Sequence, residues 1–244
     1  MADGTFYGIG VGPGDPRWIT VQAAEILSHC RQVYVPRARA DGDSVALEIA
    51  RRYLRADAAV HELTFPMTTD QSLLRQSWRQ AAAEVRATLS GGADCCFLTL
   101  GDPLLYSTYV YLLRELRQAW PEIRAVTVPG VTAMSAAAAL AGMAIGEGKQ
   151  TVTILPTPDD PEQLARALDG GGTVVLMKIG RRLESVLDAL ESRGLLGQAV
   201  FVARAGMSGQ RVETDLRQLR GAPEEAGYLS ILIVQTQLHA GDAP

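Results

Sequence analysis

Lysine and histidine are scarce in this 244-residue chain, and their scarcity excludes some kinds of site. Only Lys149 and Lys178 are lysines, so nearly all of the 23 basic residues are arginines. The three histidines, His29, His61 and His239, lie far apart in the sequence, and none has a second ligand at the spacing typical of zinc or haem sites. We therefore expect no metal centre.

Cysteine and positive charge are also limited. The three cysteines, Cys30, Cys95 and Cys96, are an odd number with two adjacent in an apolar run. They are not a disulfide framework, and we expect them to be buried as small hydrophobic side chains. A formal net charge of −4 argues against the broad basic face of a nucleic-acid-binding protein. With 47% hydrophobic and 20% charged residues, the chain is not disordered either.

Long hydrophobic runs are missing as well. The most apolar stretch, residues 133–145, is shorter than the roughly 20 residues that cross a bilayer. The first residues, Met1 to Gly4, include neither a basic region nor the apolar core of a signal peptide. We therefore expect no membrane association, and a cytoplasmic protein.

Short runs rich in β-branched residues alternate with helical stretches, which is typical of α/β proteins. Strands are predicted over residues 5–9, 32–35, 59–63, 95–100, 125–128, 151–155, 173–177, 199–202, 210–214 and 229–234. Helices are predicted over residues 20–27, 45–54, 73–89, 106–120, 133–140, 162–168 and 183–191. We interpret this pattern as two α/β domains, residues 1–128 with a mainly parallel sheet and residues 129–238 with a mixed one.

A glycine-rich loop, Gly8-Ile9-Gly10-Val11-Gly12-Pro13-Gly14-Asp15-Pro16, follows the first strand. The dinucleotide fingerprint Gly-x-Gly-x-x-Gly fails here, because its third glycine is replaced by Pro13 or Asp15. The second strand also ends in Val-Pro-Arg rather than in a ribose-binding acid. A P-loop fails too, since Gly148-Lys149 is followed by Gln150. The loop is either a tight strand-to-helix turn or a ligand site of another kind.

Two more loops follow predicted strands in the same way. They are Gly101-Asp102-Pro103-Leu104-Leu105-Tyr106-Ser107 and Pro129-Gly130-Val131-Thr132-Ala133-Met134-Ser135. In open α/β sheets, ligands bind beyond the carboxyl ends of the strands. Three such loops therefore favour one ligand-binding crevice over three unrelated turns.

These motifs together resemble the tetrapyrrole (corrin/porphyrin) methyltransferases, and the resemblance covers about residues 5–234. Within the family, the chain is most similar to the enzymes that methylate C20 of precorrin-2. The stretches that carry this are Phe65-Pro66-Met67-Thr68, residues 102–111, Ser135-Ala136-Ala137-Ala138-Ala139 and Val175-Leu176-Met177-Lys178-Ile179-Gly180. One residue departs from those enzymes: position 100, which is often acidic in them, is Leu100 here. The resemblance therefore does not specify how this chain selects its substrate.

The resemblance implies a two-domain α/β fold, distinct from the Rossmann methyltransferases, with S-adenosylmethionine bound in the cleft between the domains and S-adenosylhomocysteine as product. The positions that match cofactor contacts in the family are Pro13, Leu100, Gly101, Asp102, Leu105, Thr132, Ala133, Met177, Ala205, Ser230 and Ile231. Glycines would allow backbone contacts, Thr132 supplies a hydroxyl, and Leu105 and Met177 supply apolar surface.

The implied reaction is methylation of an electron-rich tetrapyrrole carbon, C20 of metal-free precorrin-2 or of its cobalt form. We assign catalytic roles to Asp102 and Tyr106. Asp102 either accepts hydrogen bonds from pyrrole N–H groups or assists proton loss, and the alternative is that it only holds its own loop through an Asx-turn. Tyr106 and Tyr109 could line the face of the macrocycle, with core packing an equal alternative for Tyr109.

The carboxylate arms of such a substrate require local positive charge. We assign substrate binding to Arg37, Arg39 and Tyr109; other candidates for a basic rim are Arg75, Arg79, Lys149 and Arg204, and each could also be an ordinary surface charge. The family resemblance further implies a homodimer. Two alternatives stay open: methylation at another ring position, and a non-catalytic ligand-binding α/β protein.

Overall fold

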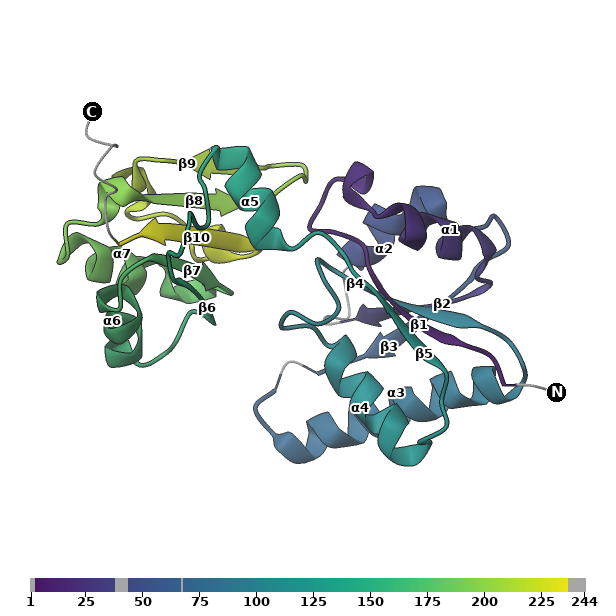
Figure 1. The fold of residues 1–244 in the computed structure, drawn as a ribbon. Coiled ribbons are helices and arrows are strands. Elements are labelled where there is room, and N and C mark those ends of the chain that lie inside the picture. The colour runs from purple at the N-terminus through teal and green to yellow at the C-terminus, as the bar shows by residue number, and fades with distance from the viewer. Residues whose placement is uncertain (1–2, 38–43, 67, 237–244) are drawn as a thin grey trace. The chain divides into compact units, whose positions relative to one another are not determined.

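The computed structural model describes residues 3–37, 44–66 and 68–236 and divides into two compact units. Unit 1 ends at Thr132 and unit 2 begins at Ala133, whereas the sequence pattern placed the division after residue 128. Each unit has its own five-stranded sheet (Figure 1). The fold class is therefore the predicted one, two α/β units.

The sheet of unit 1 is entirely parallel and has the strand order β3-β2-β4-β1-β5. Its strands are β1 (Phe6–Gly10), β2 (Gln32–Arg37), β3 (Ala59–Thr64), β4 (Cys95–Thr99) and β5 (Ala125–Val128). Its helices are α1 (Val21–His29), α2 (Val45–Ala50), α3 (Gln71–Ser90) and α4 (Tyr109–Ala119). Figure 1 shows α1 and α2 over one face of this sheet and α3 and α4 over the other. Burial from both sides explains why every residue of β4 is apolar or small and buried.

Side-chain caps fix where two helices of unit 1, α1 and α3, begin. The Thr20 hydroxyl accepts a hydrogen bond from the Ala23 amide at 3.2 Å, and the Asp70 carboxylate accepts from the Ser72 and Leu73 amides. Helix α4 starts at Tyr109, later than the predicted residue 106. The reason is local, because Tyr106 has a left-handed backbone with φ of 51°, which a helix cannot include.

The core of unit 1 on the α3–α4 side is rich in aromatic rings. The rings of Phe6 and Phe97 both stack on Tyr109, with centroids 5.8 and 6.4 Å away. Helix α3 contributes small side chains such as Ala81 and Ala82, which let it lie close to the sheet. All three cysteines are free and buried, as predicted. Burial raises the pKa of the Cys95 thiol, so this thiol stays protonated.

The sheet of unit 2 is mixed, as predicted, with the order β6-β7-β10-β8-β9. Its strands are β6 (Val152–Pro156), β7 (Thr173–Met177), β8 (Ala199–Ala203), β9 (Arg211–Glu213) and β10 (Ser230–Gln235). Its helices are α5 (Ala133–Ala141), α6 (Pro161–Asp169) and α7 (Leu183–Glu191). Strand β10 is antiparallel to both of its neighbours, β7 and β8. The carboxyl ends of β7 and β8 and the start of β10 therefore share one edge of the sheet.

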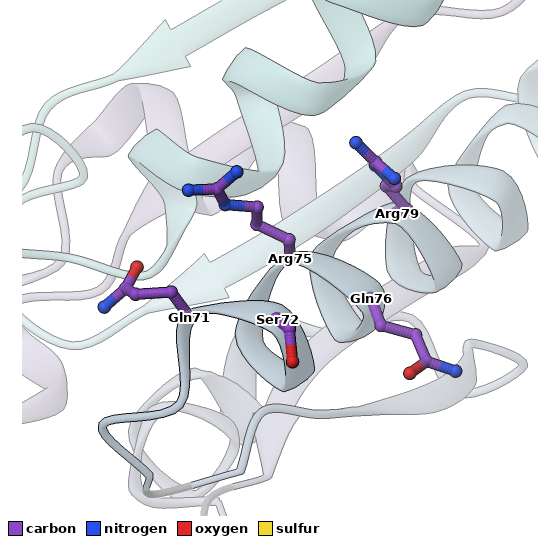
Figure 2. A pocket seen from close by; sticks show the side chains of 5 residues that line it. All are labelled: Gln71, Ser72, Arg75, Gln76 and Arg79. Carbon is purple, nitrogen blue, oxygen red and sulfur yellow. The ribbon is translucent and has the colours of Figure 1, made fainter.

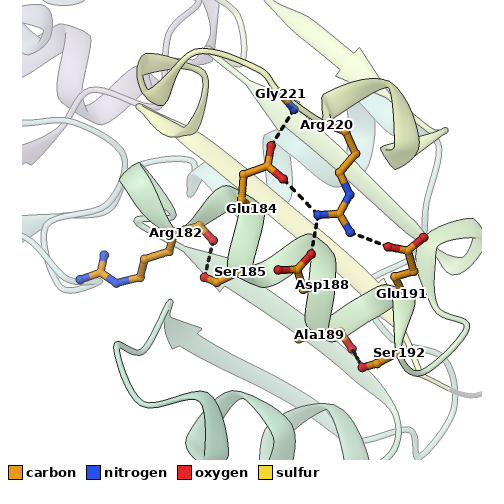
Figure 3. A network of polar contacts seen from close by, with 9 residues as sticks. All are labelled: Arg182, Glu184, Ser185, Asp188, Ala189, Glu191, Ser192, Arg220 and Gly221. Carbon is orange, nitrogen blue, oxygen red and sulfur yellow. Dashed lines mark hydrogen bonds and ion pairs between the residues drawn. The ribbon is translucent and has the colours of Figure 1, made fainter.

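One face of the unit 2 sheet packs against α6 and α7, through side chains such as Leu176, Phe201 and Leu187. Helix α5 contacts β8 and β10 (Figure 1). On the surface, Arg220 forms ion pairs with three carboxylates of α7, those of Glu184, Asp188 and Glu191, at 3.0, 2.5 and 2.6 Å (Figure 3). The Glu184 carboxylate also accepts a hydrogen bond from the Gly221 amide, so the network connects the turn around Arg220 to α7. None of the described helices is long and apolar enough to span a membrane.

Candidate functional site

The three loops singled out in the sequence lie next to one another in unit 1. Strand β1 lies between β4 and β5 and is parallel to both, so the carboxyl ends of all three strands are neighbours. The loops that follow them cover residues 11–20, 100–108 and 129–132. The topology thus brings together segments more than one hundred residues apart in sequence, at the edge where α/β sheets bind ligands.

Backbone contacts between glycines join the three loops. Gly12 and Gly101 exchange two backbone hydrogen bonds, with N···O distances of 3.2 and 2.9 Å. A Cβ atom on Gly130 would lie 2.2 Å from the Gly101 carbonyl oxygen, and one on Gly10 would lie 2.7 Å from the same oxygen. Only glycine allows three backbones to approach this closely. The first loop is therefore more than a strand-to-helix turn.

Asp102 links the second loop to the third. One carboxylate oxygen accepts a hydrogen bond from the Leu104 amide at 2.9 Å, in an Asx-turn, and the other accepts from the Gly130 amide at 3.0 Å. The positioning role that the sequence left as an alternative is thus present. A carboxylate has about four lone-pair sites, so these two bonds leave capacity for a ligand.

The first loop is fixed by its own cap. Asp15 accepts a hydrogen bond from the Arg17 amide at 2.8 Å and forms an ion pair with the guanidinium of the same residue. These hydrogen bonds lower the pKa of the Asp15 carboxyl. Pro13, predicted to contact the cofactor, is buried within this loop.

Apolar and aromatic side chains of the second loop reach the surface. Leu100 and Leu105 are half-buried, while Leu104 and Tyr106 expose 62% and 40% of their surface. Tyr106 has φ of 51°, a conformation that a bulky side chain rarely adopts outside turns and functional sites. Exposure and an unusual backbone at one aromatic residue agree with a ligand-facing position.

The remaining predicted cofactor residues lie in the last turn of unit 1 and in unit 2. Thr132 ends unit 1 and is half-buried, and Ala133 begins α5. Met177 and Ile231 are register partners on β7 and β10. Ser230 pairs with Ala203 two residues before Ala205, so these predicted residues gather at the shared edge of the unit 2 sheet. Each is at least nine-tenths buried: Met177, Ala205, Ser230 and Ile231.

Left-handed backbone at non-glycine residues marks both edges. Among the described residues, four such positions occur: Tyr106 in unit 1, and Lys178, Arg204 and Leu229 in unit 2, with φ between 51° and 54°. Lys178 follows Met177, Arg204 precedes Ala205 and Leu229 precedes Ser230. This conformation costs about 1 kcal/mol or more for a residue other than glycine. The sequence analysis did not select Lys178 or Leu229, because no local motif reveals the sign of φ.

The residues predicted to bind substrate have different environments. Arg37, at the carboxyl end of β2, pairs with Glu62 at 2.5 Å, and Arg39 lies outside the described residues. Tyr109 has no exposed surface, and its hydroxyl is 2.7 Å from the Thr127 hydroxyl oxygen. A Cβ atom on Gly8 would overlap its ring. Tyr109 therefore packs α4 against the sheet and presents no surface to a ligand in this conformation.

Two of the rim candidates, Arg75 and Arg79, line a surface pocket of about 490 Å³ together with Gln71, Ser72 and Gln76 (Figure 2). All five residues belong to α3, so the pocket is a hollow over one helix face. Arg79 also pairs with Glu115 of α4 at 3.7 Å. Lys149 and Arg204 are exposed in unit 2.

The comparisons with known proteins agree with the motifs. The family model described as Tetrapyrrole (Corrin/Porphyrin) Methylases matches residues 5–220. A cobalt-precorrin-2 C(20)-methyltransferase of Salmonella typhimurium is 34% identical, over 96% of this chain and 98% of the relative. A precorrin-2 C(20)-methyltransferase of a Sinorhizobium species is 32% identical, over 95% of each.

Longer relatives and solved structures are similar as well. The cobalamin biosynthesis protein CobIJ of Mycobacterium tuberculosis is 36% identical over 86% of this chain, which spans only 42% of that protein. The structure of cobalt precorrin-4 methyltransferase CbiF matches with a TM-score of 0.72 and 20% identity, over 95% of this chain and 94% of its own. Uroporphyrin-III C-methyltransferase of Thermus thermophilus, complexed with S-adenosyl homocysteine, matches with a TM-score of 0.60 and 22% identity, over 95% and 92%. These two likenesses show the shared fold.

Proposed function

Because the chain belongs to the tetrapyrrole (corrin/porphyrin) methylases, we propose that it methylates C20 of precorrin-2, or of its cobalt form, with S-adenosylmethionine as methyl donor. The observation that carries the proposal is the match, over nearly the full length of both chains, to relatives named as C(20)-methyltransferases. The mycobacterial relatives are more than twice as long as this chain. They therefore support its membership of the family, but their complete activity is not carried over to it.

The residues of the loop edge fit S-adenosylmethionine. A Cβ atom on Gly101 would meet no other atom within 4 Å, although φ there is +71°. Gly101 therefore leaves open space beside its backbone, where a ligand can approach peptide groups directly. We propose that unit 1 holds the cofactor through Pro13, Leu100, Gly101, Asp102, Leu105 and Thr132, and that unit 2 does so through Ala133, Met177, Ala205, Ser230 and Ile231.

When bound, S-adenosylmethionine supplies a methyl group on a sulfonium, which an electron-rich carbon can attack. The protein's main contribution is then to hold the acceptor carbon in line and to exclude water. The amides of Leu104 and Gly130 fix the Asp102 carboxylate, and some of its lone pairs remain available for a ligand. We assign to Asp102 the binding of substrate pyrrole N–H groups or acceptance of the proton lost from C20.

Tyr106 is assigned to the face of the macrocycle. Tyr106 is 40% exposed, and its left-handed backbone lies just before α4. Around the substrate, Arg37 and Arg39 are proposed to bind carboxylate arms, since arginine holds carboxylates through two parallel hydrogen bonds. Arg37 would exchange its pairing with Glu62 for this contact. We also propose that the protein is a homodimer in the cytoplasm. Sedimentation of the purified protein, which gives its molecular mass in solution, tests the dimer.

The test is an anaerobic incubation of the purified protein with S-adenosylmethionine and either precorrin-2 or its cobalt form. We expect one substrate to gain the mass of one methylene group while S-adenosylhomocysteine forms. A methyl group labelled with carbon-13 then locates the modified carbon by NMR. If only one of the two, metal-free precorrin-2 or its cobalt form, gains this mass, that form is the substrate.

Other outcomes identify which part of the proposal fails. Methylation at a carbon other than C20 would keep the reaction class and reject the position. S-adenosylhomocysteine binding without any transfer, on either substrate, would reject this substrate assignment. Absence of both binding and transfer would reject the proposed reaction and the proposed cofactor.

A further inference from the structure

Thr157 is buried directly after strand β6 and holds the chain at the point where strand β7 ends. Its amide and its hydroxyl both donate hydrogen bonds to the Met177 carbonyl oxygen, at 2.7 and 3.1 Å. Thr157 exposes only 5% of its surface. Because we assign a cofactor contact to Met177, these two bonds act on the cofactor edge of unit 2.

The two hydrogen bonds have different origins. Strands β6 and β7 are parallel, and Pro156 is the register partner of Met177. In a parallel ladder the residue after the partner donates its amide to the carbonyl, so the amide bond of Thr157 continues the sheet pattern. The hydroxyl bond is additional and depends on the side chain alone. Since a carbonyl oxygen has two lone pairs, the two bonds together occupy the acceptor sites of Met177.

The carbonyl that Thr157 holds lies at the start of a strained turn. Lys178, the next residue, has φ of 54°, a conformation that is unfavourable for a residue other than glycine. The far end of the turn is packed against backbone, because a Cβ atom on Gly227 would lie 1.9 Å from the Gly180 carbonyl oxygen. The Thr157 hydroxyl therefore adds a side-chain bond at the near end of this turn, next to Met177.

A second buried threonine provides a contrast. Thr173 begins β7, four residues before Met177, and is fully buried. Within the part of the chain that the structure describes, its hydroxyl has no hydrogen-bond partner. Burial of a threonine beside this strand is thus separate from the fixing of a peptide group, which Thr157 performs.

We propose that Thr157 is a positioning residue, whose hydroxyl fixes the peptide between Met177 and Lys178 and thereby sets the affinity for S-adenosylmethionine. The inference rests on the proposed function, because it takes Met177 to contact the cofactor. A contact surface that is already ordered binds its ligand more tightly than one that binding must first order. Without the hydroxyl, only the amide bond holds the carbonyl, and ligand binding has to order the turn.

The test measures the dissociation constant for S-adenosylhomocysteine by calorimetry in Thr157→Val and Thr157→Ala. Valine keeps the shape of the side chain without its hydroxyl. Alanine places no methyl group against the Met177 carbonyl, so it serves if the valine variant does not fold. We expect the constant to rise about fivefold in each variant. The KM for S-adenosylmethionine should rise to the same extent, and the KM for the tetrapyrrole should not change.

Two further variants separate positioning from a general effect on folding. Thr157→Ser keeps the hydroxyl and should restore most of the affinity. Thr173→Val makes the same substitution where the hydroxyl has no partner, and should leave the constant unchanged. All constants are measured well below the melting temperature of each variant, so a loss of stability by itself would not raise them.

A methionine NMR signal separates this inference from the proposed function. In protein with methionine methyl groups labelled with carbon-13, the signal of Met177 is identified by its loss in Met177→Leu, and it should move when S-adenosylhomocysteine is added. No binding by the native protein, or an unmoved signal, would reject the cofactor assignment and the inference with it. A moved signal with equal constants in the native protein and the valine and alanine variants would overturn the inference alone.

Discussion

The sheet edge of unit 1 and that of unit 2, to which we assign cofactor contacts, both contain left-handed backbone but differ in the residues that adopt it. At the unit 1 edge, left-handed backbone falls on Gly12, Gly101 and one larger residue, Tyr106. At the unit 2 edge it falls on Gly180 and Gly206 and on three larger residues, Lys178, Arg204 and Leu229. Crowding acts on other glycines of the unit 1 edge. A Cβ on Gly130 would be 2.2 Å from the Gly101 oxygen, whereas one on Gly101 itself would meet no atom within 4 Å. In unit 2, Lys178 and Arg204 are exposed and keep their side chains despite the strain of this backbone conformation.

Gly130→Ala tests the closeness of the unit 1 loops and has the largest expected effect. The added Cβ would overlap the Gly101 carbonyl, which is backbone and cannot move aside. We expect a loss of about 3 kcal/mol of unfolding free energy, measured by urea denaturation. Gly197→Ala is the matched control, because a Cβ there meets nothing within 4 Å. Equal stability of the two variants would show that the loops are not packed as described.

Asp102 variants separate loop positioning from chemistry. Asp102→Ala leaves the amides of Leu104 and Gly130 without their acceptor, and we expect it to lose about 2 kcal/mol of stability. Asp102→Asn keeps one acceptor oxygen but places its NH2 group opposite the second amide, so we expect it to lose about 1 kcal/mol. Its kcat should fall about 100-fold if the carboxylate handles the proton. Full methyl transfer by Asp102→Asn, with unchanged cofactor affinity, would leave Asp102 with the positioning role alone.

Gly101→Ala tests a glycine with open space beside it, in contrast to Gly130, which lies against backbone. Its Cβ would meet no protein atom, so the stability cost should be only the strain of a left-handed alanine, about 1 kcal/mol. The same methyl group would occupy the space assigned to the cofactor. We expect the dissociation constant for S-adenosylhomocysteine, measured by calorimetry, to rise about tenfold, a change worth 1.4 kcal/mol. An unchanged constant would place the cofactor elsewhere.

Tyr109→Phe has the smallest expected effect and tests whether this residue binds substrate. It removes the hydrogen bond to Thr127 and should cost about 1 kcal/mol, with kcat/KM unchanged because the ring is buried. Thr127→Val should cost a similar amount. A fall in kcat/KM with unchanged stability would instead restore Tyr109 to the substrate site.

The same residue gives a pH dependence with a definite sign. Burial raises the pKa of the Tyr109 phenol above its ordinary value of about 10. The unfolded chain therefore ionises this phenol first. Its contribution to stability is complete below about pH 10 and is lost as the pH rises through the higher folded value. Tyr109→Phe should accordingly lose less stability on alkaline titration than the native protein does.

Local patterns predicted most of the elements, and their failures have physical causes. Strands β4 and β7 were evident because burial on both faces requires continuous apolar runs. The start of α4 was placed too early, since nothing in Tyr106-Ser107-Thr108 announces a left-handed tyrosine. Tyr109 was assigned to the substrate from its position in a motif, but packing against Gly8 placed it in the core.

By itself, the sequence determined the α/β class, the three glycine loops and the family, because these depend on periodicity and on ordered motifs along the chain. The tertiary structure alone decided which loops touch and which side chains remain available. Strand order brings Gly10, Gly101 and Gly130 together, and it places the carboxyl ends of β7 and β8 on either side of the start of β10. Neighbours of this kind arise from contacts between residues far apart in the chain, and no local pattern specifies them.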